Sequence, residues 1–198
     1  MTTKRTRPLS YLSHLFSAPI IAAPVFVTLS ILEAAKPIQT VESIVFATFL
    51  PLVGVLYFAR LEGLEYDIPE RSARAKPFVV AVVSYATGFV LLSLNNAPLL
   101  VSGLMLAYSI NTSVMFFITL FWKISIHAAG ITGPLTFLVF RLGYAWGLLY
   151  LLVVPVGLVR LRLGQHTVSQ VVAGGVLSAA LTWAEIVYFI PLMQLFHI

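Results

Sequence analysis

The sequence predicts an all-α protein, a polytopic membrane bundle with about seven helical spans. Two observations lead to this fold class. Apolar residues make up 60% of the 198-residue chain, and long apolar runs recur along its whole length. A soluble domain of this size has no interior large enough to bury so much apolar surface. We therefore expect one integral-membrane domain over residues 1–198, without a separate soluble domain.

Five apolar runs are individually long enough, or nearly so, to cross the ~30 Å hydrocarbon core. They lie at about 12–33, 42–59, 78–94, 98–121 and 168–195. The first follows a basic segment, as a signal peptide would. However, it continues to Leu32 without a small-residue cleavage site, so we interpret it as a retained span. Asn95 to Pro98 predict a tight turn between the third and fourth runs.

Residues 128–158 are too long for one simple crossing, because a single helix over this range would measure ~46 Å. Glycine and proline recur within it. A break between Arg141 and Tyr144 would give two short spans and a total of seven. The total is six if this range does not form two crossings.

The basic residues favour seven spans. In that arrangement one side of the membrane carries only Lys36 and Arg141. The other side carries Lys4, Arg5, Arg7, Arg60, Arg71, Arg74, Lys76, Lys123, Arg160 and Arg162. The positive-inside rule places this basic side in the cytoplasm, so we expect a multi-pass protein of the cell membrane with its polar side facing the cytoplasm. The net charge of +5 then reflects topology, and we expect no nucleic-acid partner.

Three polar clusters fall on the basic side. They are residues 67–78 with Arg71, Arg74 and Lys76, residues 122–130 with Lys123, Ser125 and His127, and residues 160–170 with Arg160, His166 and Gln170. Each has a purely structural interpretation, as an interfacial segment that contacts lipid head groups or as a helix cap. Together the clusters supply up to five cations, a serine hydroxyl and two histidines, which is suitable chemistry for a phosphate site.

The third cluster also predicts a helix start. Thr167 and Gln170 fit a capping box, in which the glutamine oxygen accepts a hydrogen bond from the backbone N–H of Thr167. The same oxygen can instead accept from the ring of His166 and fix its tautomer. We expect the histidine contact, on one helical face, if the helix begins before His166.

These motifs resemble the signatures of the type 2 phosphatidic acid phosphatases, which are membrane enzymes. Arg160, His166 and Gln170 follow the spacing of the third signature, SR-x5-H-x3-D. Ser125-Ile126-His127 resembles the second signature, PSGH, and Lys76-Pro77 stands where the first, K-x6-RP, ends.

The resemblance implies a function for each cluster. His166 would be the nucleophile that becomes phosphohistidine, His127 would protonate the leaving oxygen, and Gln170 would orient His166. The resemblance also implies a set of phosphate-holding residues, which we extend by the nearby Lys123. They are Arg160, Ser125, Lys76, Arg74, Arg71 and Lys123. The chain is therefore expected to hydrolyse a lipid phosphate.

The chain departs from the family pattern at several positions. Val159 replaces the serine of the third signature, and Ile124 and Ile126 replace the proline and glycine of the second. Gln170 replaces the aspartate that orients the histidine, and glutamine supplies no negative charge to an imidazolium. The form HT-x2-Q also occurs in dolichyl-diphosphate phosphatases. The expected substrate is therefore an isoprenoid diphosphate or a phospholipid phosphomonoester.

Two other functions remain open. A phosphohistidine enzyme can transfer the phosphoryl group to an alcohol instead of water, and the same helices can form a non-catalytic lipid-binding or transport protein. The chain has four histidines, one aspartate and no cysteine, so we expect no metal site and no cofactor. The expected partners are a phosphorylated lipid and the membrane lipids.

Overall fold

A computed structural model describes residues 9, 12, 13, 15–61 and 75–195, and this part of the chain is helical without a strand. The all-α prediction is confirmed. The elements are α2 (Ala18–Leu32), α3 (Pro37–Ile44), the π-helical η1 (Val45–Phe49), α4 (Leu50–Leu61), α5 (Ala75–Leu94), α6 (Leu99–Phe121), α7 (Ile126–Leu142), the 3-10 helix η3 (Tyr144–Leu152), α8 (Val153–Arg162), α9 (Val168–Ala184), the π-helical η4 (Glu185–Phe189) and α10 (Ile190–Leu195).

Five continuous helices within the described residues are long and apolar enough to cross a membrane. They are Pro37–Leu61, Ala75–Leu94, Leu99–Phe121, Tyr144–Arg162 and Val168–Leu195. Large apolar side chains such as Leu94, Phe117 and Leu148 are exposed on the outer faces, where lipid would cover them. The remaining apolar helices, α2 and α7, have 15 and 17 residues and are shorter than a usual span.

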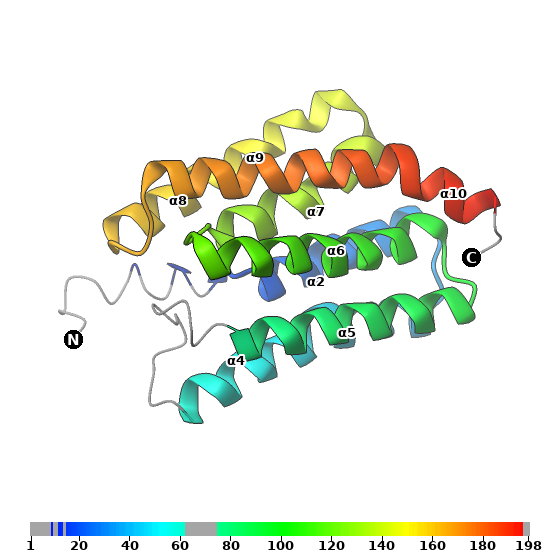
Figure 1. Cartoon of the computed structure of the whole chain (residues 1–198). Helices are drawn as coiled ribbons and strands as arrows, with labels where there is room; N and C mark the ends of the chain where they lie inside the picture. Colours follow the sequence, from blue (N-terminus) through cyan, green and yellow to red (C-terminus); the bar gives the residue numbers. More distant parts are fainter. Residues whose placement is uncertain (1–8, 10–11, 14, 62–74, 196–198) are drawn as a thin grey trace.

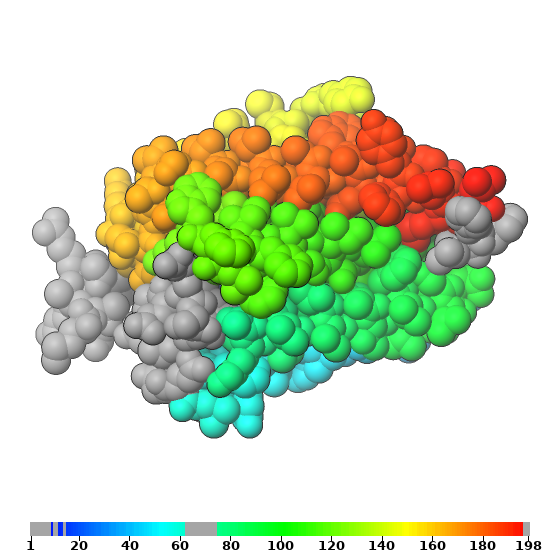
Figure 2. Space-filling model, viewed as in Figure 1, coloured from blue at the N-terminus to red at the C-terminus, as the bar shows by residue number. Residues whose placement is uncertain are grey.

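The helices run side by side along the long axis of the molecule (Figure 1). On the face seen in Figure 2, α9 and α10 lie beside α6, and α6 lies beside α5. The central helix is α7, which packs against α2, α6, α8 and α9. Fully buried apolar side chains from α2, α6 and α7, including Phe26, Leu104 and Phe137, form the core between them.

The turns form where the sequence predicts them. Asn96 adopts φ +54° in the turn between α5 and α6, a conformation that asparagine tolerates better than most residues. The break predicted between Arg141 and Tyr144 is also present, because α7 ends at Leu142 and Gly143 has φ +100°. Next to this break, the guanidinium of Arg141 pairs with Glu33 at the end of α2.

Two helices contain π-helical segments that the apolar pattern does not predict. In η1, the carbonyl of Phe46 accepts a hydrogen bond of 2.7 Å from the hydroxyl of Ser84 on α5. This contact stabilises a helix turn whose backbone hydrogen bonds are rearranged. The second π segment, η4, begins at Glu185 within the final helix.

The described parts of the three polar clusters lie at one end of the bundle. In Figure 1, α6 and α8 end there, and α5 and α9 begin there. Lys76 lies in the first turn of α5, Lys123 follows α6, and Arg160 is in the last turn of α8. Arg71 and Arg74 lie outside the described residues.

Candidate functional site

The segment from Ser125 to His127 is held directly against α9. Ser125 is the N-cap of α7, and its hydroxyl accepts a hydrogen bond of 3.4 Å from the N–H of Ala128. Its own N–H donates to the carbonyl of Gln170 at 3.1 Å. A Cβ on Gly174 would overlap the carbonyl oxygen of Ser125, so only glycine permits this approach. The second and third clusters are therefore joined through the backbone.

Because of this contact, α7 begins further inside the bundle than α9 does. Ser125 lies level with Gly174, which is six residues beyond Val168 at the start of α9. Six helical residues correspond to about 9 Å. His127, in the first turn of α7, consequently lies deeper in the bundle than the start of α9.

A tight turn brings the chain back from Arg160 to His166. The N–H of Gln165 donates to the carbonyl of Arg160 at 3.0 Å, and the N–H of Gly164 donates to Leu161 at 2.9 Å. With Gly164 at φ +64°, this is the Schellman arrangement that ends α8. The five residues between Arg160 and His166 thus complete the last turn of α8 and form its C-terminal cap.

Arg160 is an unusual side chain for a membrane protein, because it is only 1% exposed. Its Nη1 donates a hydrogen bond of 2.6 Å to the hydroxyl of Ser13. The exposed Arg162, two residues later, is on the same helix. A buried cation is costly unless polar groups surround it, so this burial indicates a dedicated polar site.

Gln170 makes both of the contacts that the sequence places in competition. Its Oε1 accepts from the N–H of Thr167 at 3.1 Å and lies 3.2 Å from Nδ1 of His166. The helix begins at Val168, so the condition of a helix start before His166 is not met, and the two side chains do not share a helical face. His166 precedes the N-cap residue Thr167, and its ring nevertheless contacts Oε1 of Gln170, the oxygen that also caps the helix.

This geometry fixes the neutral tautomer of His166. An amide oxygen accepts hydrogen bonds and cannot donate them, so Nδ1 of His166 carries the proton. The lone pair of the neutral ring is then on Nε2. His166 is buried, which places that nitrogen inside the protein.

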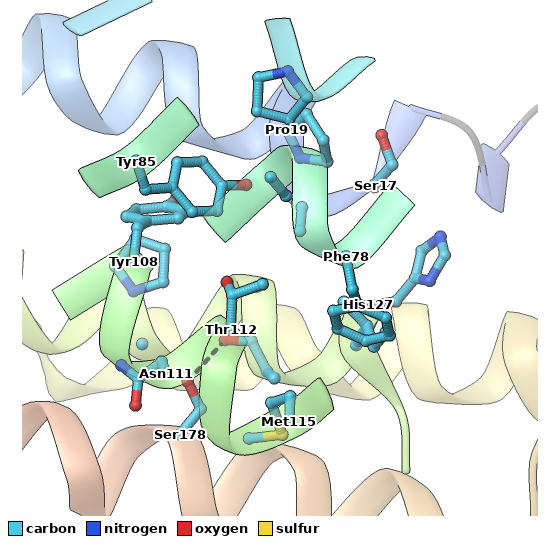
Figure 3. Close-up of a pocket in the computed structure, with 18 of the residues that line it drawn as sticks. Ser17, Pro19, Phe78, Tyr85, Tyr108, Asn111, Thr112, Met115, His127 and Ser178 are labelled. Carbon is cyan, nitrogen blue, oxygen red and sulfur yellow. Dashed lines mark hydrogen bonds between the residues drawn. The ribbon is translucent and has the colours of Figure 1, made fainter. Parts of the chain in front are cut away.

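His127, Arg160 and His166 line one cavity of about 170 Å³. Figure 3 shows His127 on one side of this pocket and Tyr108 with Asn111 on the other. Most residues of its lining are apolar. One face of α6 forms a long wall, from Leu104 through Ala107 and Asn111 to Met115. Residues 104–115 span about 16 Å of this helix, so the cavity extends from the polar end towards the middle of the bundle.

The other predicted site residues that the structure describes do not line this cavity. Ser125 is fully buried beneath Gly174. The ammonium of Lys76 lies 5.9 Å from the centre of the Phe58 ring, and Lys123 is half-buried between α6 and α7. Gln170 contacts the ring of His166 instead.

Sequence reasoning missed several polar residues of the cavity. Ser17 precedes α2 and lines the pocket, and Ser13 contacts Arg160. Asn111 and Thr182, which lie outside the three clusters in the sequence, also line the cavity. A signal was present for Asn111, because an amide in the middle of a long apolar run is costly unless it has a partner.

Comparison with known proteins does not assign this chain to a family. No model of a protein family, no curated protein and no solved structure matches it. The case for a function therefore depends on the residues of the site and on the motif resemblance.

Proposed function

We propose that this protein is a membrane lipid phosphatase that hydrolyses an isoprenoid diphosphate or a phospholipid phosphomonoester through a phosphohistidine intermediate. The observation that carries this proposal is the meeting of Arg160, His166 and His127 at one cavity. The apolar remainder of that cavity suits a lipid tail, and the polar end suits a phosphate.

In the proposed first step, Nε2 of His166 attacks the terminal phosphorus. The bond that breaks joins this phosphorus to the oxygen of the leaving lipid alcohol or, in a diphosphate, to the bridging oxygen of the leaving lipid monophosphate. His127 gives its proton to that leaving oxygen. Arg160 stabilises negative charge on the equatorial phosphate oxygens. In the second step, water attacks the phosphohistidine while His127 accepts the proton of the water, which releases inorganic phosphate and restores His166.

We extend the same proposal to the cations at this end of the bundle. Lys76, Lys123, Arg71 and Arg74 attract the phosphate to the membrane surface, and Ser125 supports His127 through the start of α7. The contact between His166 and Gln170 holds the attacking nitrogen in position.

Phosphate release tests this proposal directly. Protein purified in detergent is incubated with a phospholipid phosphomonoester or with a polyprenyl diphosphate, and inorganic phosphate is measured. An added alcohol that becomes phosphorylated would instead identify a phosphotransferase. Folded protein that binds these lipids without releasing phosphate would contradict catalysis and indicate a lipid-binding or transport protein.

Gln170 gives a prediction that separates orientation from capping. Gln170→Leu removes both contacts of Oε1, and turnover should fall by about 10–100-fold, the loss typical of partners that orient a metal-bound histidine. Gln170→Glu keeps the acceptor and adds a charge that stabilises the imidazolium, so turnover should be retained or raised. The measurement is kcat for phosphate release.

Thr167→Val is the matched control for Gln170. It removes the capping hydroxyl, which accepts from the N–H of Gln170 at 3.4 Å, but leaves Oε1 beside His166. The lost cap should cost about 0.5–2 kcal/mol of stability. Turnover should change less than threefold. Equal losses of turnover in Thr167→Val and Gln170→Leu would show that Gln170 serves the cap alone.

We also propose seven spans in the cell membrane, with the polar end in the cytoplasm. The native chain has no cysteine, so single cysteines can be placed at the exposed positions Arg60, Arg162 and Lys36 and labelled in intact cells. Positions 60 and 162 should be protected from an impermeant reagent, and position 36 should react. Reaction of 60 and 162 from opposite sides would contradict the topology.

A further inference from the structure

The cavity that His127 and His166 line ends inside the bundle. Its lining residues on α7 recur along the helix, and they are Ile126, His127, Ala129, Gly130, Gly133 and Pro134. The next residue at this spacing is Phe137, which is fully buried and does not line the cavity. A Cβ on Gly103 of α6 would lie 3.7 Å from Cε1 of Phe137, so this ring fills the space between the two helices.

The lining on α5 ends in the same way. Tyr85 is the last residue of α5 that lines the cavity, and its ring packs 5.2 Å from the ring of Tyr108, between centroids. Figure 3 shows both rings at the side of the pocket away from His127. One turn beyond Tyr85, a Cβ on Gly88 would lie 2.6 Å from Phe46 and 3.2 Å from Met105. Packed side chains therefore close the inner end of the cavity.

The length of the cavity limits the tail that it can hold. Pro134 follows His127 by seven residues of the same helix, which is about 10 Å. The wall of α6 from Met115 to Leu104 covers about 16 Å. An extended chain advances about 1.2 Å per bond, so these lengths correspond to about 8–13 bonds. The volume of about 170 Å³ is close to that of an engineered apolar cavity of about 150 Å³ that holds one benzene molecule. There is room for one tail and not for two.

We propose that this cavity is a closed site for a single lipid tail of about eight to ten carbons. Among the substrates proposed above, it selects single-chain lipid phosphates of medium length, such as decyl phosphate or geranyl diphosphate. The second chain of a phospholipid, or the distal part of a long polyprenyl chain, would overpack the closed end. The phosphate end of this inference rests on the proposed function, whereas the tail site can be tested by binding alone.

A series of n-alkyl phosphates from hexyl to hexadecyl tests the tail site. Binding is measured by calorimetry in detergent, and kcat/KM by phosphate release. All probes are compared at the same mole fraction in the micelle, so that partition into detergent does not produce the difference. Affinity should be highest for octyl and decyl phosphate. Hexadecyl phosphate should bind at least about tenfold more weakly than decyl phosphate, because extra methylenes forced into a packed interior are unfavourable.

Two opposite substitutions on α6 should move the preferred length in opposite directions. Leu104→Ala enlarges the inner end and should lengthen the best tail by about three carbons, the difference between the two side chains. Ala107→Leu adds the same volume one turn nearer to the histidines and should shorten the best tail by about as much. Leu104→Val is a smaller change that serves if the alanine variant does not fold.

Leu92→Ala is the matched control. Leu92 is as fully buried as Leu104, but it lies outside the cavity lining. Its replacement should leave the preferred length unchanged. A substitution that only destabilises the protein lowers the affinity for every probe, without a shift in the preferred length.

The outcomes separate the tail site from catalysis. Equal affinity of the native protein for decyl and hexadecyl phosphate, or a preferred length that stays the same in both α6 variants, would overturn the closed tail site. A length preference in binding without phosphate release would support the tail site and contradict the phosphatase proposal. Phosphate release that does not depend on tail length would do the reverse.

Discussion

Replacing His166 by glutamine should abolish phosphate release, with a loss of at least about 10³-fold. Glutamine retains much of the size of histidine, but its amide has no nitrogen that can attack phosphorus. Catalytic residues act together, so loss of the nucleophile alone lowers the rate of catalysis by a factor of this order or larger. The measurement is the initial rate of phosphate release from the substrate that the native protein hydrolyses.

Trapping of the intermediate gives this prediction a second readout. Native protein that is quenched during turnover of a ³²P-labelled substrate should carry acid-labile, base-stable label, and His166→Gln should carry none. Gln165→Asn is the matched control, because this neighbour does not line the cavity and should leave rate and label unchanged. Label that persists in His166→Gln would transfer the nucleophilic role to another residue, with His127 the first to be examined.

The two arginines at the end of α8 give the second large effect. Arg160→Gln should lower kcat/KM by about 10²–10³-fold, because a buried cation beside developing charge contributes strongly to transition-state stabilisation. Arg162→Gln makes the same chemical change on an exposed side chain two residues away, and it should change kcat/KM less than threefold. The comparison is made at fixed ionic strength, because screening affects exposed charges most.

Stability must be measured alongside this comparison. Arg160 donates to Ser13, so Arg160→Gln also removes a buried hydrogen bond. Ser13→Ala removes that bond while keeping the cation, and it reports how much of the loss is structural. If Arg160→Gln and Arg162→Gln reduce kcat/KM equally, Arg160 contributes only general attraction of anions to the basic surface.

Local sequence patterns predict the features of this fold that depend on neighbouring residues. Apolar runs give the positions of the helices, Asn96 marks a turn, and Gly143 marks the break after α7. The capping box at Thr167 also forms as the pattern indicates. In each turn or cap, the residues that interact are within four or five positions of one another, so a local sequence pattern is enough to predict the structure.

Contacts between distant segments were beyond this kind of reasoning. Ser13 reaches Arg160 across 147 positions of the chain, and Asn111 reaches Thr182 across 71. Both depend on how the helices pack, which no local pattern specifies. The double contact of Gln170 was also missed, because we treated capping and orientation as exclusive when one oxygen accepts both hydrogen bonds.

The shortness of α2 and α7 has a consequence for the surrounding bilayer. At 15 and 17 residues these neighbouring helices are about 22 Å and 25 Å long, less than the ~30 Å of a typical hydrocarbon core. Lipid that reaches these short helices must thin locally to avoid hydrophobic mismatch, because tilting compensates only for spans that are too long. The membrane surface would then dip towards the recessed start of α7, so that a lipid phosphate enters at head-group level. We therefore expect the acyl-chain length of the host bilayer to affect access to the proposed site.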